Sequence, residues 1–242
     1  MILIKNLSKT YVGGKKAVKN LSLEIDDGDL FAFVGLNGAG KSTTIKAMVG
    51  ILPFEEGEIY INNKSIKERA NECKLEMAYV PDNPEIYNFM KGVDYVKFIL
   101  SVYRCEFNEK EMVELAKEME IYDALGDLVS SYSHGMKQKI VLLAAFLHHP
   151  KVLILDEPFV GLDPKATFFL KEKMKEYVRE GNIIFFSTHI LEVAEKLCNK
   201  VAIIKEGNLV VSGTMEDVTK YQGLEEVFLG VANENTKNEN NF

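Results

Sequence analysis

Hydrophobic positions recur with two different spacings along the chain, first in short strand-like runs and later at helical intervals. The early runs are brief, and several alternate between apolar and polar side chains, as half-buried strands do. These runs cover residues 2–7, 20–25, 58–61 and 77–80. The run LFAFVG at 30–35 is nearly all apolar, which is typical of a strand covered on both faces. We therefore expect the first 80 residues to be mainly β-structure.

Between about residues 88 and 148 the spacing becomes helical. Met112, Leu115, Ala116 and Met119 recur at the interval of one helix face, and no part of this stretch alternates like a strand. We expect an inserted helical segment here rather than more of the sheet.

Strand-like and helix-like segments then follow one another. The apolar runs at 152–156 and 183–188 predict buried strands, and 201–213 predicts a hairpin that turns near Gly207 and Asn208. The helix expected between the first two runs has one apolar face, made by Ala166, Phe169, Leu170, Met174, Tyr177 and Val178. Alternation of apolar strands with helices favours a largely parallel α/β sheet.

The chain ends in an amphipathic segment and a polar tail. Leu224, Val227, Phe228 and Val231 share a helical face, and the residues after them are almost all polar. We expect one domain over residues 1–230 and a disordered tail at 231–242.

Composition narrows the classes of partner. The formal net charge is −7, so no nucleic acid is expected as partner, because phosphate backbones attract basic surfaces. The longest apolar run, at 140–147, is far shorter than the ~18 residues that a membrane-spanning helix needs. Polar residues interrupt the N-terminus at once, so we expect no signal peptide. The three cysteines form no CxxC pair, which indicates neither a zinc site nor a disulfide framework.

One glycine-rich segment carries a specific phosphate-binding pattern. Gly35, Gly40, Lys41 and Ser42 satisfy G-x-x-x-x-G-K-[ST], between an apolar strand and a helical stretch at 43–52. Glycines allow backbone N–H groups to surround phosphate oxygens, and the helix N-terminus adds partial positive charge. Lys41 would reach the β- and γ-phosphates and Ser42 would hold Mg²⁺. The alternative is an ordinary glycine-rich turn.

The other residues of this loop are expected to line the same nucleotide site. They are Asn37, Gly38, Ala39 and Thr43.

Two later strands end in residues suited to catalysis. VLILDEP at 152–158 places Asp156 and Glu157 at a strand end, where Asp156 can support Mg²⁺ and Glu157 can take a proton from an attacking water. His189 follows the strand at 183–188 and can donate a hydrogen bond to a γ-phosphate oxygen. The alternatives are an acidic turn and a structural histidine.

The motifs, taken in order, resemble those of ATP-binding cassette (ABC) ATPases. The set is Tyr11, GLNGAGKST, YVPD, YSHGMKQK, VLILDEP, GLDP and STH, and the resemblance spans residues 2 to about 230. It implies an α/β fold: a P-loop NTPase (RecA-like) core with an antiparallel β subdomain and an inserted α-helical subdomain at about 88–148. It also implies ATP and Mg²⁺ as cofactors.

The resemblance assigns further residues to the nucleotide. Tyr11 matches an aromatic residue that stacks on adenine; the alternative is core packing. Ser133 and Gly135 match a signature motif that presses on the γ-phosphate held by a second protomer. Asp163 matches a loop that contacts the other protomer, and the alternative is a turn residue before Pro164.

Two motifs depart from the family pattern. Tyr132, His134 and Met136 replace a leucine, a glycine and a glutamine of the usual signature, and a pH-sensing role for His134 stays open. Asp82 stands where the family usually has glutamine, in a loop that touches Mg²⁺ or the attacking water. Aspartate still supplies a metal ligand.

The resemblance implies an ATP-hydrolysing subunit of a transporter, and YSHGM and LEEVFL are similar to exporter subunits. Its expected partners are separate transmembrane permease subunits and a second nucleotide-binding subunit, identical or paralogous, at the cytoplasmic face of the cell membrane. A docking surface is expected at 83–103, where apolar and aromatic residues gather; the alternative is that they form the core of the helical insert. They are Ile86, Tyr87, Phe89, Met90, Tyr95 and Phe98.

Two rival functions remain at this stage. One is a non-transport ABC ATPase that acts on DNA or ribosomes, and the other is an ATP-switched signalling module. The first usually has a coiled-coil insert or two fused cassettes, and the sequence suggests neither. Lys41, Glu157 and His189 together argue for turnover rather than for signalling alone.

Overall fold

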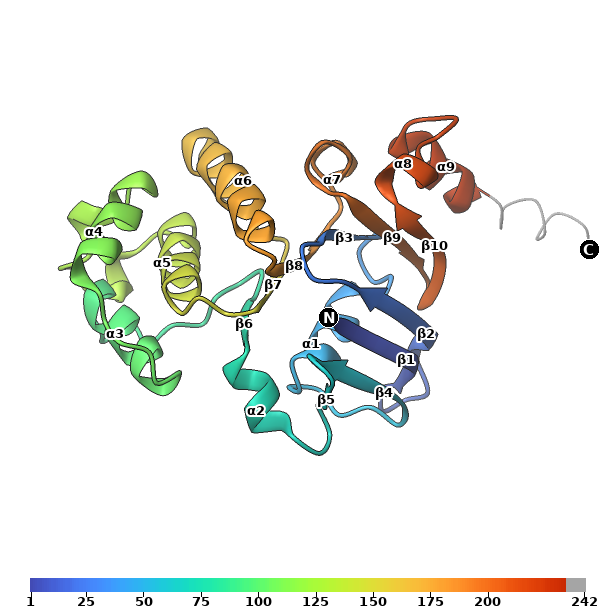
Figure 1. Cartoon of the computed structure of the whole chain (residues 1–242), viewed down its shortest axis with the longest axis horizontal. Helices are drawn as coiled ribbons and strands as arrows, with labels where there is room; N and C mark the ends of the chain where they lie inside the picture. Colours follow the sequence, from blue (N-terminus) through green and yellow to red (C-terminus); the bar gives the residue numbers. More distant parts are fainter. Residues whose placement is uncertain (234–242) are drawn as a thin grey trace, which may run out of the picture.

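The computed structural model describes residues 1–233, which form two β-sheets and a set of helices (Figure 1). The smaller sheet is antiparallel with strand order β2–β1–β4–β5. Its strands are β1 (Ile2–Thr10), β2 (Lys16–Ile25), β4 (Glu56–Ile61) and β5 (Lys64–Ser65). This sheet contains three of the four early strands expected from the sequence.

The larger sheet has strand order β10–β9–β3–β8–β7–β6. Its strands are β3 (Leu30–Val34), β6 (Met77–Val80), β7 (Val152–Asp156), β8 (Ile183–Thr188), β9 (Lys200–Lys205) and β10 (Asn208–Thr214). The neighbours from β6 to β9 run parallel, and only the hairpin β9–β10 in this sheet is antiparallel. The carboxyl ends of β3, β6, β7 and β8 therefore lie along one edge, which confirms the parallel α/β sheet.

The central strands are buried on both faces, as their continuous apolar sequence predicts. In β3, Leu30, Ala32 and Val34 join one hydrophobic cluster, whereas Phe31 and Phe33 join a second cluster on the opposite face. The first cluster lies against the longer helices and the second against the antiparallel sheet. A strand with solvent on one side would have alternated instead.

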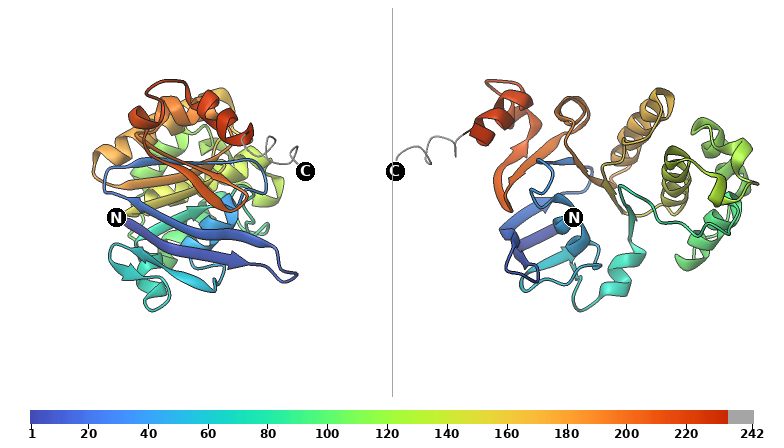
Figure 2. Two further views of the ribbon diagram at one scale, coloured as in Figure 1. Left: turned by 90° about the vertical axis from the view of Figure 1, so that its right-hand side faces the viewer. Right: turned by 180° about the vertical axis from the view of Figure 1, so that it is seen from behind.

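Helices cover the larger sheet and form a separate group beside it (Figure 2). The group beside the sheet, left of it in Figure 1, consists of α3 (Gly92–Val102), α4 (Glu109–Glu118) and α5 (His134–Leu147), with short 3₁₀ turns at Tyr122–Ala124 and Val129–Ser131. The remaining helices are α1 (Lys41–Met48), α2 (Ala70–Leu75), α6 (Pro164–Arg179), α7 (Leu191–Leu197), α8 (Met215–Val218) and α9 (Leu224–Asn233). Met112, Leu115, Ala116 and Met119 are all buried, as their spacing predicts.

Two local boundaries differ from the expectation. The helix after the phosphate loop ends at Met48 rather than near residue 52, because Gly50 adopts a positive φ of 68° and the N–H groups of Ile51 and Leu52 turn back to the Lys46 carbonyl. The hairpin turn consists of Glu206 and Gly207 rather than Gly207 and Asn208. Both turn residues have positive φ, as a two-residue hairpin turn requires.

The C-terminal helix α9 continues to Asn233, beyond the expected start of the tail at residue 231. Residues 234–242 of that tail lie outside the described residues. Among residues 1–233, no helix combines the length and apolar character needed to cross a bilayer.

Candidate functional site

The glycine-rich loop at 35–40 connects β3 to α1 and packs so closely at two positions that only glycine fits there. Gly40 has φ 115°, and a Cβ there would lie 2.5 Å from the Ala17 carbonyl oxygen. A Cβ on Gly35 would lie 2.6 Å from the Ile204 carbonyl oxygen. The loop is therefore held tightly between β2 and β9. Gly40 caps α1 without any side-chain hydrogen bond, so backbone N–H groups at this helix end remain open to an anion.

A cavity of about 290 Å³ lies in front of this loop. It brings together nine of the residues singled out in the sequence: Tyr11, Asn37, Gly38, Gly40, Lys41, Ser42, Thr43, Asp82 and Glu157. Gly35 and Ala39 do not line it, because they pack beneath the loop. The cavity thus unites residues from four segments that are far apart in sequence.

Tyr11 stands at the rim of the cavity. Its hydroxyl lies 3.2 Å from the Thr43 Oγ1, and the residue is 40 % exposed. The alternative of core packing is therefore wrong for Tyr11, and its ring is accessible to a planar ligand.

Lys15 also lines the cavity, although sequence reasoning missed it. Gly13 and Gly14 both have positive φ and form a tight turn in which the Tyr11 N–H bonds to the Lys15 carbonyl. This turn returns Lys15 to the side of Tyr11. The Gly-Gly pair after the tyrosine was the signal that could have found it.

Lys41 and Glu157 meet inside the cavity. The Lys41 Nζ lies 3.4 Å from the Glu157 Oε1 and donates to the Gly35 carbonyl at 2.7 Å. The lysine side chain is 6 % exposed and the glutamate 14 %. An ammonium group at this depth is well placed to meet the negative charge of a polyphosphate.

Glu157 is positioned by the strand next to its own. Its N–H donates to Ser187 of β8, at 3.2 Å to the carbonyl oxygen and 3.1 Å to the hydroxyl. Its backbone is left-handed with φ 49°, which costs free energy in a non-glycine residue. The Glu157 Oε2 lies 3.0 Å from the His189 Nδ1. The expectation that the carboxylate of β7 and the histidine after β8 share one sheet edge is confirmed.

Asp156 lies directly behind the cavity and is 1 % exposed. It accepts a 2.5 Å hydrogen bond from the Ser187 hydroxyl. Burial raises the pKa of Asp156, while hydrogen bonds from Ser187 and Ser42 act in the opposite direction. The buried Asp156 carboxylate, together with the Ser42 hydroxyl, offers hard oxygen ligands to a metal cation.

This donor set fits Mg²⁺, which prefers oxygen ligands and is usually held by one or two carboxylates together with substrate phosphates. Asp82, the other expected ligand, is exposed at the end of β6 and lines the cavity. Residues 1–233 contain no group of three or more His, Cys, Asp or Glu side chains suited to a metal. The fit is therefore to a cation that arrives with phosphate rather than to an all-protein cage.

Ser133, Gly135 and Asp163 lie outside the cavity and form a second loop cluster. Ser133 caps α5 by accepting a hydrogen bond from the Met136 N–H at 3.2 Å. Gly135 packs so closely that a Cβ would lie 2.4 Å from the Gly161 carbonyl oxygen.

Asp163 caps α6, accepting from the Ala166 N–H at 2.8 Å, and pairs with the Lys139 Nζ at 2.6 Å. These interactions, the Ala166 hydrogen bond first, lower the pKa of Asp163. A second helix-opening loop is thus present in the chain and is separate from the phosphate loop.

Comparison with known proteins identifies this arrangement. The family model for "ABC transporter" matches residues 18–160, and a model described as "AAA domain, putative AbiEii toxin, Type IV TA system" matches 128–195. The chain is similar to the ABC-type transporter ATP-binding protein EcsA of Bacillus subtilis, with 32 % identity over 95 % of this chain and 93 % of that protein. It is also similar to the linearmycin resistance ATP-binding protein LnrL of the same organism, with 31 % identity over 92 % of this chain and 72 % of LnrL.

A solved structure of an ATP-binding subunit of an ABC transporter superimposes with a TM-score of 0.89 and 32 % identity, covering 96 % of this chain and 99 % of that one. The fold expected from the resemblance is confirmed, and with it the ATPase class. The chain belongs to the ABC transporter family as an ATP-binding subunit.

Proposed function

We propose that this ATPase powers export, through ATP-driven pairing of two nucleotide-binding subunits that act on separate transmembrane permease subunits. The observation that carries the proposal is the meeting of Lys41, Glu157 and His189 at the edge of the parallel sheet, in front of the phosphate loop.

The loop and its flanks bind the nucleotide. Backbone N–H groups before α1 and the Lys41 ammonium hold the phosphates, while the exposed Tyr11 ring accepts the base by stacking. Ser42, Asp156 and Asp82 would hold Mg²⁺. When bound, this ion neutralises charge on the β- and γ-phosphate oxygens.

Hydrolysis depends on releasing Glu157 from Lys41. Without phosphate nearby, the Lys41 ammonium compensates the Glu157 carboxylate at 3.4 Å. A polyphosphate competes for the lysine, which leaves the carboxylate to accept a proton from water. His189, 3.0 Å from the other carboxylate oxygen, orients Glu157 and can donate to a phosphate oxygen. Strand β8 and the residue that follows it thus position Glu157 as the general base.

The second loop cluster supports a site shared between two subunits. Ser133 and His134 are exposed at the N-terminus of α5, and that helix end lies outside the cavity of its own chain. A helix N-terminus attracts anions, so a partner protomer's γ-phosphate is a suitable ligand. His134 rests against Gly161, where a Cβ would meet the His134 Cδ2 at 2.6 Å.

A small aromatic surface at the start of the helical group supports docking to a permease. Of the six residues considered, Ile86 and Tyr95 are buried and belong to the helical core, Met90 is half-buried, and Tyr87, Phe89 and Phe98 are exposed. Their rings contact one another, with centroids 5.7 Å apart for Tyr87–Phe89 and 6.0 Å for Tyr87–Phe98. Exposed rings in contact are typical of a protein interface.

Export is favoured by the similarity to LnrL, which is named for resistance to linearmycin. Expelling a toxic compound is one way in which a transporter confers resistance. For an exporter subunit that uses ATP, the corresponding location is the cytoplasmic face of the cell membrane, where ATP is available.

The experiment is capture of the membrane partner from detergent-solubilised cells with the tagged chain. We expect a multi-span membrane protein to co-purify with wild type and to be lost with Phe89→Asp. Tyr221→Asp, at an aromatic residue that is 89 % exposed elsewhere, is the matched control and should retain the partner. Turnover stimulated by DNA or ribosomes, with no membrane protein captured, would instead support the non-transport alternative.

A further inference from the structure

A groove between the helical group and α6 has no part in the function described above. It is a cavity of about 760 Å³ between α4 and α6, and the end of α5 forms its floor. Phe146 and Tyr177 in that floor are almost completely buried, as is Leu115 on the α4 side. The groove therefore has an apolar base and is open to solvent above it.

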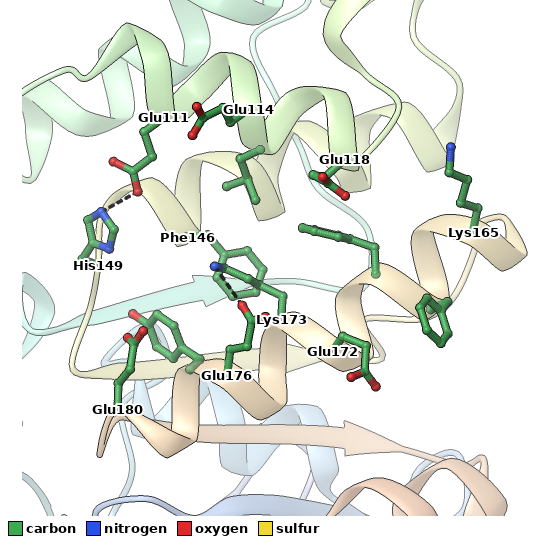
Figure 3. Close-up of a pocket in the computed structure, with 14 residues that line it drawn as sticks. Glu111, Glu114, Glu118, Phe146, His149, Lys165, Glu172, Lys173, Glu176 and Glu180 are labelled. Atoms are coloured by element: carbon green, nitrogen blue, oxygen red, sulfur yellow. Dashed lines mark hydrogen bonds and ion pairs between the residues drawn. The ribbon is translucent and has the colours of Figure 1, made fainter.

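Six glutamates line the walls of this groove (Figure 3). Glu111, Glu114 and Glu118 project from α4 on one side, and Glu172, Glu176 and Glu180 project from α6 and its C-terminal end on the other. Each set recurs at intervals of three or four residues, so each forms a row along one helix face. At 1.5 Å rise per residue, each row is about 10–12 Å long.

The basic residues nearby compensate only part of this charge. Lys173 pairs with Glu176 at 3.3 Å, and His149 lies 3.0 Å from Glu111. Lys165, the second lysine of the groove, pairs with Glu120 outside it. Among the described residues, Glu118 and Glu180 have no ion-pair partner. Glu172 pairs with Lys175 at 2.8 Å and Glu114 with Lys110 at 4.0 Å, both lysines lying outside the groove lining. The groove therefore keeps a negative charge that is concentrated at Glu118 and Glu180.

An exposed aromatic ring adds apolar surface to the lining of the groove. Phe168 lines the groove and is 67 % exposed, although it belongs to a helix whose other large apolar residues are turned inward. Phe169 beside it is only partly buried. Covering this ring with an apolar side chain of a ligand would be favourable, because it removes apolar surface from water.

We propose that this groove binds a basic amphipathic helix of a partner protein. Such a helix would place an apolar stripe on Phe168 and the groove floor. Lysines or arginines on both flanks, at helical spacing, would face the two glutamate rows. A second copy of this chain is the wrong partner for an acidic groove, because each chain already carries a net charge of −7. The linear rows favour an extended cationic ligand over a compact one.

The test uses a fluorescent 14-residue peptide of leucine and lysine with all leucines on one helical face. Its control is an isomer of identical composition with the leucines scattered. Binding is measured by fluorescence anisotropy with the intact chain, so the result is independent of ATP hydrolysis and transport. We expect saturable binding of the first peptide that is at least about tenfold tighter than that of its isomer.

Two matched variants locate the binding. Glu118→Lys with Glu180→Lys reverses the two unpaired carboxylates, and we expect it to weaken binding roughly tenfold. Glu24→Lys with Glu68→Lys changes the charge equally at exposed positions on the β-sheet side and should alter affinity less than about twofold. Phe168→Ala should weaken binding several-fold, with Phe168→Leu restoring part of it.

Three results would overturn the proposal. They are the absence of saturable binding, equal affinity for the two isomers, and equal loss in the two charge-reversal variants. Complete displacement of the peptide by an equal concentration of spermine would also overturn it, because it would show a site for small cations.

Discussion

The Glu157 carboxylate lies between the side chains of Lys41 and His189. The Lys41 Nζ is 3.4 Å from one carboxylate oxygen and the His189 Nδ1 is 3.0 Å from the other. The three side chains come from the phosphate loop, the end of β7 and the segment after β8. Because β7 and β8 are adjacent parallel strands, with Asp156 opposite Ser187 in register, this contact follows directly from the sheet order. The same geometry makes the role of each residue testable.

Replacing Glu157 by glutamine should abolish most turnover without preventing nucleotide binding. The amide keeps the shape of the side chain but cannot accept a proton, so we expect phosphate release to fall about 10²–10⁴-fold. ATP binding, measured by equilibrium dialysis, should persist because Lys41 and the loop are intact. Glu24→Gln, at an exposed position on β2, is the control and should be fully active. Normal turnover by the Glu157 variant would exclude it as the base.

Asp82 should contribute through an oxygen atom directed at the cavity. Asp82→Ala removes this atom and should slow hydrolysis, whereas Asp82→Gln supplies an amide oxygen and should partly restore the rate. Phosphate release at several Mg²⁺ concentrations distinguishes the two variants. Full activity in both would leave Asp82 without a role in the isolated subunit.

Two inactive variants should complement each other if sites are shared between subunits. Lys41→Ala damages the phosphate loop, and Ser133→Arg damages the loop at the start of α5. A mixed dimer then contains one doubly damaged site and one intact site. We expect mixing to restore part of the ATP-dependent association, measured by light scattering, or of hydrolysis.

That experiment needs demonstrated mixed pairing as its control, for example by co-purification of two differently tagged variants. If the natural partner is a paralogue, the two substitutions are divided between the two chains. With mixed pairing shown, a lack of any recovery would indicate that the second loop acts within its own chain.

Asp163 should stabilise the fold in a pH-dependent way. Asp163→Ala removes the cap of α6 and the Lys139 pair, and we expect a loss of about 1 kcal/mol in the free energy of unfolding. Asp163→Asn keeps an acceptor for the Ala166 N–H and should lose less. Urea unfolding measures both.

The sign of the pH effect follows from the lowered pKa of Asp163 in the folded state. The contribution of its charge is fully present above the unfolded value of about 3.9 and is lost as the pH falls through the lower folded value. The stability difference between wild type and Asp163→Asn should therefore be constant from pH 5 to 7 and shrink below about pH 4. A difference that grows on acidification would contradict this assignment.

The sequence predicted those parts of the site whose chemistry is local. The phosphate loop was recognisable because glycine, lysine and serine at fixed spacing belong to one turn. The meeting of Glu157 and His189 was predictable because both follow apolar strands of a parallel sheet. Lys15 was missed because its place depends on the turn at Gly13 and Gly14.

Features that depend on tertiary packing could not be assigned residue by residue. Ile86 and Tyr87 are adjacent and both apolar in character, yet one is buried and the other exposed. The glutamates of α4 and α6 are visible in the sequence as charged helix faces. Only the packing of both helices on α5 brings the two faces to opposite walls of one groove.

The tightly packed glycines change how natural variation in this chain should be interpreted. Gly35, Gly40 and Gly135 each face a backbone carbonyl oxygen at a distance that excludes even a methyl group. An inherited alanine at position 40 would retain every hydrogen-bonding group of the loop and still displace it from β2. Such a variant would lose ATPase activity although no atom that contacts the nucleotide had been removed. A second mutation that restores activity would be expected in β2 around Ala17 rather than in the nucleotide site.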